Sequence, residues 1–347
     1  MKPTFLNHFE AMKAGFSPDL LTDDYVEAVH CLCTLFPYDT ASDFGFETRL
    51  GDPVASCDFF MMISRNSDGA LMLAGKSQVA GLSPALLEDP FWRNLTAMFA
   101  AWTEPGALLA EMIELFWLEF DCGPTAYNTS PNIFFRITEE PGLSRFAQWI
   151  RMRQVLDDIY RILFGIDFPA ELAETLKHCI ESLPVNANLY QTGFMIPRKT
   201  EAIRLVLTGF NKENILEYLK KIGWQGEMKV AEEMIAVYAG MFDYSVYNVY
   251  IGQSVLPFFG IEMYYKDMRQ PQWEPRWGET FRFLESKNLA LSSKCKGMTD
   301  YCGQRTVSGL FTVRYIKGIN HLKLVYKPGM PLECKGYFGT MIRKQGK

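Results

Sequence analysis

Three apolar segments of this chain carry basic residues at alternate positions, in a pattern that is typical of strands. Arg204 lies within Ile203–Leu207, Lys323 within Leu322–Tyr326, and Lys335 two residues before Tyr337. Side chains of a strand alternate between its two faces, so each cation faces away from its apolar neighbours. Such a face is either exposed to water or binds an anion. Its repetition in three strands favours binding, and amines and guanidinium groups are well suited to phosphate oxygens.

Acids and phenols follow the same alternation and add further chemistry. Glu47 could act as a general base, or as an anion that stabilises developing positive charge, or as the salt-bridge partner of Arg49. The small Gly45 beside it would leave room for a substrate, and Arg49 would keep its carboxylate ionised. Tyr250, Tyr264 and Tyr337 could shield a positive charge with their ring faces, although tyrosine in a strand more often only packs.

The polar side of these strands forms one set, and an apolar set opposes it. The polar set is Glu47, Arg49, Asp58, Arg136, Arg204, Glu262, Tyr264, Lys266, Lys323, Lys335 and Tyr337. The opposite set is Phe44, Phe46, Phe59, Met61, Ile133, Phe135, Leu205, Leu207, Ile261, Met263 and Phe338. Amphipathic helices separate the strand pairs, so the apolar faces can pack on helices.

Two arrangements fit this pattern: an open sheet with its polar face in water, or a closed antiparallel barrel with a polar lumen and helices outside. Closure removes the edge strands that promote aggregation. In a closed barrel the cations would converge, and the predicted acids would offset only some of them. A polyanion such as a diphosphate would complete the balance.

Composition limits the alternatives. The chain has 347 residues, of which nearly half are apolar, and this composition indicates a large core. Its net charge of -5 does not indicate the strongly basic surface that binds nucleic acid. No apolar run reaches the roughly 20 residues of a membrane helix, and no signal peptide opens the chain, so we expect a cytoplasmic protein with free thiols. The eight cysteines form no CxxC pair and the four histidines lie far apart, so no metal site is expected.

The order of elements predicts one domain over residues 1–347, with residues 1–40 as an N-terminal helical segment. Strands are expected near 44–50, 57–64, 132–137, 189–196, 202–208, 246–252, 259–266, 321–327 and 332–339. Residues 70–75 are expected to pair with the strand at 57–64, residues 84–120 to be helical, and residues 295–318 to be loop. Asp157 and Asp158 faintly suggest a terpene-synthase motif, but a solvated helix face explains them better.

Four segments resemble the ABBA-type prenyltransferases, in particular the branch that prenylates cyanobactin peptides. They are Phe46-Glu47-Thr48 with Cys57–Met62, Gln191–Met195 with Ile203–Leu207, Phe259–Tyr265, and Leu322–Tyr326 with Lys335–Phe338. The resemblance implies an α+β fold: a ten-stranded antiparallel barrel ringed by helices, with the substrates inside. It also implies that the Lys and Tyr of the closing strands hold diphosphate and that a strand acid faces the acceptor. One departure is Cys57-Asp58, where the family often has a basic residue.

These observations predict transfer of a prenyl group from an allylic diphosphate, dimethylallyl or geranyl, to a side chain of a peptide or to an aromatic small molecule. Glu47 would be catalytic, and Asp58 and Glu262 would join the tyrosines in the substrate pocket. A magnesium ion could accompany the diphosphate, or the cations could replace it. The alternative is a barrel that binds a peptide or small molecule without chemistry, which the departure at Asp58 favours. The diphosphate-binding candidates are Arg49, Arg136, Arg204, Lys266, Lys323, Lys335 and Tyr337.

Overall fold

The computed structural model describes residues 3–123, 129–138, 140, 142–196, 202–266, 274–308 and 312–345. In these residues, eleven strands form one antiparallel sheet. They are β1 (Asp43–Arg49), β2 (Cys57–Ser64), β3 (Ile113–Phe120), β4 (Asn132–Ile137), β5 (Asn188–Phe194), β6 (Ile203–Thr208), β7 (Tyr244–Ile251), β8 (Val255–Tyr264), β9 (Gly303–Val307), β10 (Thr312–Tyr326) and β11 (Glu333–Gln345).

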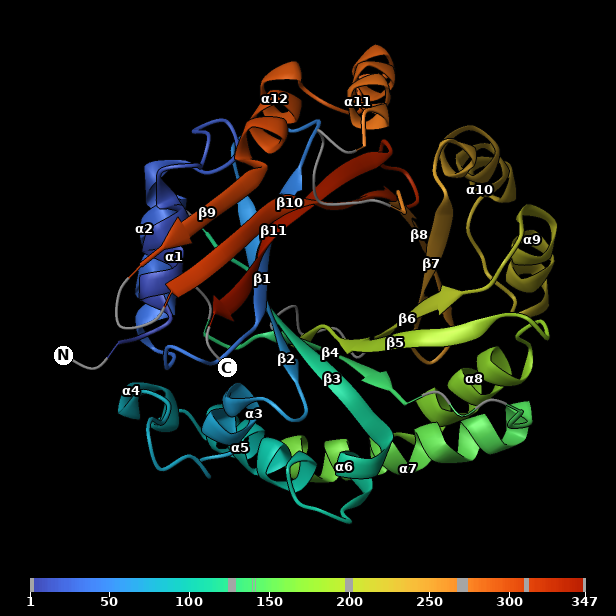
Figure 1. Ribbon diagram of the computed structural model, residues 1–347. Coiled ribbons are helices and arrows are strands. Elements are labelled where there is room, and N and C mark those ends of the chain that lie inside the picture. Colours follow the sequence, from blue (N-terminus) through green and yellow to red (C-terminus); the bar gives the residue numbers. More distant parts are fainter. Residues whose placement is uncertain are drawn as a thin grey trace.

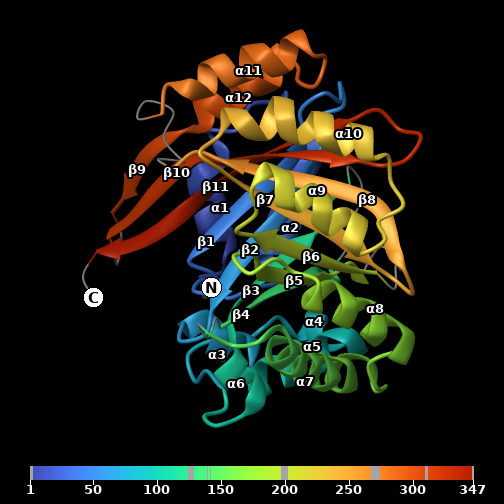
Figure 2. The same cartoon turned by 90° about the vertical axis from the view of Figure 1, so that its right-hand side faces the viewer.

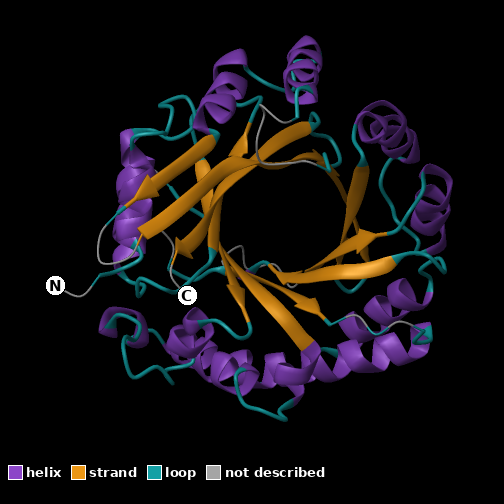
Figure 3. Ribbon diagram, in the orientation of Figure 1, coloured by secondary structure: helices purple, strands orange, loops and turns teal. Residues whose placement is uncertain are grey.

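The sheet closes on itself. Strands β1 to β8 pair in sequence order, β8 pairs with β10, β10 with β11, and β11 with β1. Among the strands of the described residues, only β9 stands outside this ring, paired with the N-terminal part of β10. Figure 1 looks into the resulting barrel, and Figure 3 shows strands inside and helices outside. The predicted fold class, a closed antiparallel barrel surrounded by helices, is confirmed.

Helices cover the outside of the barrel, as the side view in Figure 2 also shows. They are α1 (Leu6–Lys13), α2 (Asp23–Thr34), α3 (Asp68–Leu73), α4 (Pro84–Leu87), α5 (Pro90–Trp102), α6 (Leu108–Met112), α7 (Arg145–Phe164), α8 (Ala170–Glu181), α9 (Lys212–Lys221), α10 (Met228–Glu233), α11 (Arg276–Ser286) and α12 (Ser292–Tyr301). No described helix is both long and apolar enough to cross a bilayer. All eight cysteines are free thiols.

The alternation of side chains explains why the barrel has this inside and outside. Phe44, Phe46 and the rest of the predicted apolar set are buried in the core between the barrel and its helices. Their neighbours of opposite parity therefore face the lumen. Burial of the apolar faces is the main driving force for wrapping the helices around the sheet.

Three sequence-based expectations about elements are wrong. Residues 68–73 form helix α3 instead of a strand, because the Ser67 side chain accepts a hydrogen bond from the Ala70 amide and caps it. The partner of β2 is β3, within a segment that was expected to be helical. In β3 the register shifts between Ile113 and Leu115, so the pairing is irregular at the start of this strand. Residues 295–318 contain most of α12, all of β9 and the start of β10.

A glycine on the inner face of β5 permits a close ring contact. A β-carbon at Gly193 would lie 1.9 Å from ring atoms of Phe134 on β4. Because the Phe134 ring would have to leave its contact with the Arg204 guanidinium, we predict that Gly193→Ala lowers the free energy of unfolding by about 1–3 kcal/mol in urea titrations.

The matched control is Gly278→Ala on helix α11, where a β-carbon would meet nothing within 4 Å. Alanine is the better helix former, so this variant should gain about 0.5–1 kcal/mol. Equal stability of the two variants would contradict the contact between Gly193 and Phe134.

Candidate active site

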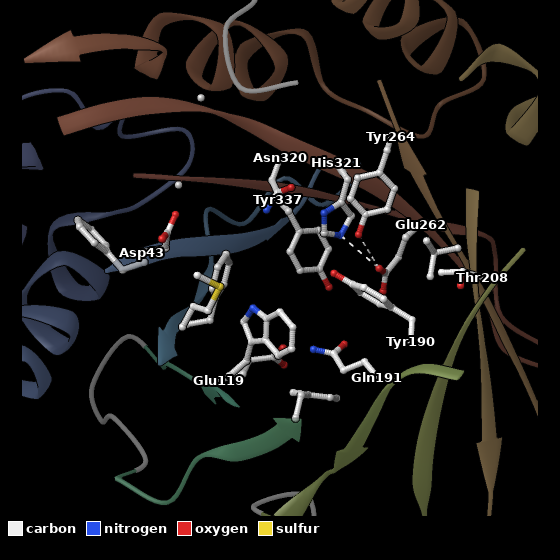
Figure 4. A pocket seen from close by; sticks show the side chains of 18 of the residues that line it. Asp43, Glu119, Tyr190, Gln191, Thr208, Glu262, Tyr264, Asn320, His321 and Tyr337 are labelled. Atoms are coloured by element: carbon white, nitrogen blue, oxygen red, sulfur yellow. Dashed lines mark hydrogen bonds and ion pairs between the residues drawn. The ribbon is translucent and has the colours of Figure 1, made fainter. Parts of the chain in front are cut away.

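The barrel encloses a cavity of about 330 Å³. Figure 4 shows side chains from strands all round the barrel pointing into it, with Glu119 on one side and Glu262, Tyr264 and His321 on the other. Its lining residues include Asp43, Phe60, Met62, Trp117, Glu119, Phe134, Tyr190, Gln191, Arg204, Thr208, Tyr244, Glu262, Tyr264, Asn320, His321 and Tyr337. The volume lies at the lower end of the range of about 300–1,000 Å³ that is usual for ligand sites.

Glu47 is buried and held by β11. Lys335 Nζ donates a hydrogen bond to Glu47 Oε1 at 2.5 Å, and the Tyr337 hydroxyl donates to Glu47 Oε2. The register of β1 and β11 places Glu47 directly opposite Tyr337. Burial alone would raise the pKa of the Glu47 carboxyl, but the charges of Lys335 and Lys323 and these hydrogen bonds hold it well below its usual range. Glu47 is therefore an anion at neutral pH.

A second buried ion pair joins β8 to β10. Lys323 Nζ donates to Glu262 Oε1 at 3.1 Å and to Asn248 Oδ1 at 2.7 Å. The Tyr264 hydroxyl donates to Glu262 Oε2 at 2.9 Å. Burial opposes ionisation of Glu262, yet the charges of Lys323 and Arg204 and the hydrogen bond from Tyr264 contribute to a pKa of about 2. This carboxylate is also ionised at neutral pH.

Aromatic rings form a continuous stack along one wall of the cavity. His321 is sandwiched between Tyr264, 4.6 Å away between ring centroids, and Tyr337, 4.1 Å away. Tyr244 stacks on Tyr264 at one end, and at the other Phe60 lies next to Tyr337 with its ring tilted by 45°. Burial lowers the pKa of His321 to about 4, so its ring is neutral at pH 7. No role was assigned to His321 from the sequence, although it shares the parity of Lys323.

Arg204 enters the lumen from β6. Its guanidinium lies 4.0 Å from the ring centroid of Phe134, and its Nε has no hydrogen-bond partner. Burial would lower the pKa of Arg204, but the nearby Tyr250, Glu119 and Tyr337 raise it, so the group stays charged. Tyr250, predicted to be in the pocket, lies opposite Arg204 in the register of β6 and β7. Burial would raise the pKa of Tyr250, but the charges of Lys323 and Arg204 lower it overall.

Acids line the opposite part of the lumen, on β2 and β3. Asp58 is the cross-strand neighbour of Glu47, and both it and Glu119 are buried. Burial and the charges of Glu47 and Glu119 raise the pKa of Asp58 to about 7. Glu119 was missed as a lumen residue because its segment was expected to be helical. The period-two placement of Trp117 and Glu119 against Phe116, Leu118 and Phe120 is the signal that would have found it.

Three predicted cations do not reach the centre of the lumen. Arg49 Nε lies 3.4 Å from Glu333 Oε2, and Arg136 pairs with Glu114; all four side chains remain partly exposed to solvent. Lys266 lies beyond the end of β8 and is exposed. The expected convergence of these three with Arg204, Lys323 and Lys335 is therefore wrong. The strands carry Arg49 and Arg136 out towards the ends of the barrel, and β8 stops at Tyr264.

Two details expected around Glu47 are also wrong. The partners of Glu47 are Lys335 and Tyr337, whereas Arg49 pairs with Glu333. The space over Gly45 is filled, because a β-carbon there would lie 2.5 Å from the ring of Phe60. The expected room for a substrate beside Gly45 is thus occupied by that ring, and the cavity lies farther along the lumen.

The buried charges of the lumen nearly cancel. Lys335 pairs with Glu47, and Lys323 pairs with Glu262. The negative charge of Glu119 raises the pKa of Arg204 and so helps to keep it protonated. Asp58 is then the remaining acid, and no described Lys, Arg or His lies within 4 Å of its carboxylate. The expected excess of cations is wrong, because it omitted Glu119 and counted the distant Arg49, Arg136 and Lys266. Protonation of Asp58 decides whether the lumen is neutral or negative.

The raised pKa of Asp58 gives a testable dependence of stability on pH. The unfolded chain ionises Asp58 near pH 4 and the folded protein near pH 7, so its contribution to stability is lost as pH rises through this window. Asp58→Asn removes the penalty. We predict that it raises the free energy of unfolding at pH 8 by on the order of 2 kcal/mol, at 1.36 kcal/mol for each pKa unit and with allowance for water near the site.

The gain should shrink towards pH 4, where Asp58 is protonated in both states. Melting temperatures of the wild type and the variant at pH 5 and pH 8 measure the difference. A variant that is less stable than the wild type at pH 8 would contradict the assignment.

Comparisons with known proteins locate this barrel among solved structures. No protein-family model matches the chain, and no curated protein matches it. AnaPT from Neosartorya fischeri aligns with a TM-score of 0.57 and 13% identity, over 98% of this chain and 93% of that chain. The prenyltransferase PriB in its binary complex with product diphosphate aligns with a TM-score of 0.53 and 11% identity, over 96% of this chain and 95% of that chain.

The ternary complex of PriB with L-tryptophan and dimethylallyl thiolodiphosphate gives a TM-score of 0.52 at 10% identity, with coverage of 96% and 95%. Sequence identities this low establish likeness of fold, and the alignments span nearly the whole of each chain. The resemblance found in the sequence is thus confirmed for the architecture: this chain has the barrel fold of the ABBA-type prenyltransferases.

Proposed function

We propose that this protein transfers a prenyl group from an allylic diphosphate to a nucleophile inside the barrel. The observation that carries the proposal is Arg204: a buried guanidinium with an unpartnered Nε that lines a cavity rich in aromatic rings. A buried donor without an acceptor costs about 1–3 kcal/mol, so an oxygen-rich ligand is the simplest partner. The fold shared with prenyltransferases points to the same ligand class.

The diphosphate would lie against the basic part of the lumen, on β6, β10 and β11. Arg204, Lys323 and Lys335 together supply the donors that a leaving diphosphate needs as its charge develops. Each lysine already donates to a carboxylate, so the diphosphate would share these donors with Glu262 and Glu47. Arg204 has a buried N–H donor, at Nε, without a hydrogen-bond partner, so we expect it to contribute most to the affinity for diphosphate.

The stack of rings would protect the allylic cation. Tyr264, His321 and Tyr337 present a continuous aromatic wall to the cavity, and Phe60, Trp117 and Phe134 face it from other strands. Ring faces attract positive charge, and the apolar edges exclude the water that would quench a carbocation. A cavity of about 330 Å³ suits a dimethylallyl group better than a geranyl group.

Glu47 is fixed as an anion by Lys335 and Tyr337, so it is better suited to stabilising positive charge than to taking up a proton. A low pKa makes a carboxylate a weak base. We therefore assign Glu47 the electrostatic role. The acceptor is a nucleophilic peptide side chain or an aromatic small molecule that reaches the cavity.

A second candidate is a barrel that binds its ligand without chemistry. The near cancellation of lumen charges favours it, since two of the three buried cations are already paired. Incubation with dimethylallyl diphosphate and candidate acceptors separates the two. Release of diphosphate with a matching gain in acceptor mass supports transfer, whereas acceptor binding without diphosphate release supports the second candidate. Parallel reactions with magnesium and with EDTA test whether a metal ion must accompany the diphosphate.

Removal of the Arg204 charge should weaken diphosphate binding. A charge-assisted hydrogen bond contributes about 1.5–3 kcal/mol, so we predict that Arg204→Gln weakens the affinity for dimethylallyl diphosphate by about tenfold to a hundredfold in calorimetric titrations. Lys266→Gln is the matched control, because Lys266 is exposed beyond β8 and should leave affinity unchanged.

Circular dichroism checks that both variants are folded. Equal affinity of the wild type and Arg204→Gln would exclude Arg204 from the diphosphate site. A loss with Lys266→Gln instead would move that site to the end of the barrel.

Neutralising Glu47 should affect turnover more than binding. The change Glu47→Gln keeps the shape and removes the charge, so we predict that turnover falls by about 10²–10³-fold, the usual effect of losing one electrostatic stabiliser, while diphosphate affinity changes little. Single-turnover rates and melting temperatures on one preparation measure the two effects. A lower melting temperature with an unchanged rate per folded molecule would reduce Glu47 to a structural partner of Lys335.

A further inference from the structure

Helix α2 carries three potential metal ligands on one face, in the helical layer outside the barrel. Glu27, His30 and Cys31 are spaced i, i+3 and i+4, and residues at these spacings are neighbours on the surface of a helix. One ligand atom of each, a carboxylate oxygen, a ring nitrogen and a sulfur, lies within 4.8 Å of the other two. In the part of the chain that the structure describes, this is the one such group of histidine, cysteine and acidic side chains.

The distances in this group fit a small divalent cation. Cys31 Sγ lies 3.6 Å from Glu27 Oε1, and His30 Nδ1 lies 3.9 Å from the same oxygen. Zinc binds sulfur at about 2.3 Å and nitrogen or oxygen at about 2.0–2.2 Å, so its tetrahedral ligands lie roughly 3.5 Å apart. Glu27 is exposed, and a rotation of its side chain with small shifts of the other two would close the remaining gaps.

The surroundings of the His30 ring give an independent indication. Its Nδ1 is shielded from water and has no hydrogen-bond partner. Its other nitrogen, Nε2, lies 3.6 Å from Glu10 Oε1 on helix α1, which runs beside α2 (Figure 1). A histidine that binds a metal through one ring nitrogen usually holds the other against a carboxylate or a carbonyl, which fixes the ring. His30 already has this arrangement, with its unpartnered nitrogen towards Glu27.

The types of ligand favour zinc over the common alkaline-earth cations. Thiolate and imidazole are typical zinc ligands, whereas magnesium and calcium prefer oxygen ligands alone. Cys31 would release its thiol proton to the solvent and bind as the thiolate. Three protein ligands leave the fourth position of the tetrahedron to water. The expectation of no metal site considered CxxC pairs and the separation of the histidines, and not mixed ligands at helical spacing.

We propose that Glu27, His30 and Cys31 bind a zinc ion on the outside of the barrel, with Glu10 as the positioning residue for the His30 ring. The site does not depend on the proposed prenyl transfer, because none of these residues lines the cavity.

A bound ion would strengthen the attachment of the N-terminal helices to the barrel. Helix α1 already packs on β1: the ring of Phe5 meets that of Phe44 edge-on, 5.4 Å away between centroids. The contact between Glu10 and His30 joins α1 to α2. Zinc would fix His30 in the orientation that makes this contact, so we expect it to raise the melting temperature of the protein.

Cobalt is the probe for the thiolate ligand, because Co²⁺ can replace zinc and its bond to a thiolate gives a charge-transfer band in the near ultraviolet. Addition of Co²⁺ to protein treated with EDTA and then desalted should produce this band, and an equimolar amount of Zn²⁺ should remove it. Cys31→Ser should abolish the band. The matched control is Cys302→Ser, which changes another partly buried thiol, at the end of α12, and should keep it.

Competition with a chromophoric chelator measures the affinity for zinc. Glu10→Gln leaves the three ligands in place and should weaken zinc binding by about tenfold to a hundredfold, the usual effect of losing a group that orients a metal ligand. His30→Ala removes a ligand and should weaken binding further. The exposed Glu217→Gln on α9 is the control for a lost surface charge and should keep the affinity. Zinc should raise the melting temperature of the wild type and leave that of Cys31→Ser unchanged.

A wild type without the charge-transfer band would overturn the site, and His30 would then be a ring held between the carboxylates of Glu10 and Glu27. A band that survives Cys31→Ser would show that other thiols bind the metal, and would also overturn it. Unchanged zinc affinity in Glu10→Gln would remove the positioning role of Glu10. Melting temperatures without metal check that each variant is folded. Zinc binding by a protein that transfers no prenyl group would support this site and count only against the proposed function.

Discussion

Charge compensation inside a closed barrel is the constraint on which the rest of this structure depends. The antiparallel ring buries Glu47, Glu262, Lys323 and Lys335 on its inner face, so these side chains cannot reach bulk water individually. The chain satisfies the constraint with pairs that cross strands, Glu47 with Lys335 and Glu262 with Lys323. Removing one member of such a pair leaves the other as a buried, uncompensated charge, which is strongly destabilising.

Some of the buried polar groups left without partners lie where a ligand would lie. Arg204 Nε and the two ring nitrogens of His321 have no hydrogen-bond partner, and the carboxylate of Asp58 has no described cation beside it. The basic strands β6, β10 and β11 and the acidic strands β2 and β3 form separate parts of one lumen. In the proposed reaction the diphosphate would lie against the basic strands, beside the aromatic stack.

Much of this arrangement could be predicted from the sequence, because a strand has a period of two. The alternation of apolar and polar residues placed Arg204, Lys323, Lys335, Glu262 and Asp58 in a lumen, and edge-strand energetics favoured closure. Partners were harder to predict. Glu47 was matched with Arg49 on its own strand, whereas the register of β1 with β11 gives it Lys335 and Tyr337. Cross-strand register depends on turns and bulges throughout the sheet, and local pattern does not encode it. Glu119 was missed because its segment was expected to be helical, whereas it lies on β3.

The measurement that tests charge compensation most directly is the number of protons taken up when dimethylallyl diphosphate binds. Titration calorimetry at pH 7.5 in two buffers of different ionisation enthalpy gives that number. If the lumen balances its charge through Asp58, the wild type takes up a substantial fraction of a proton more than Asp58→Asn does. Protons taken up by the diphosphate itself are the same for both proteins, so they cancel in this difference. Equal proton uptake by the wild type and Asp58→Asn, with diphosphate bound to both, would contradict the account.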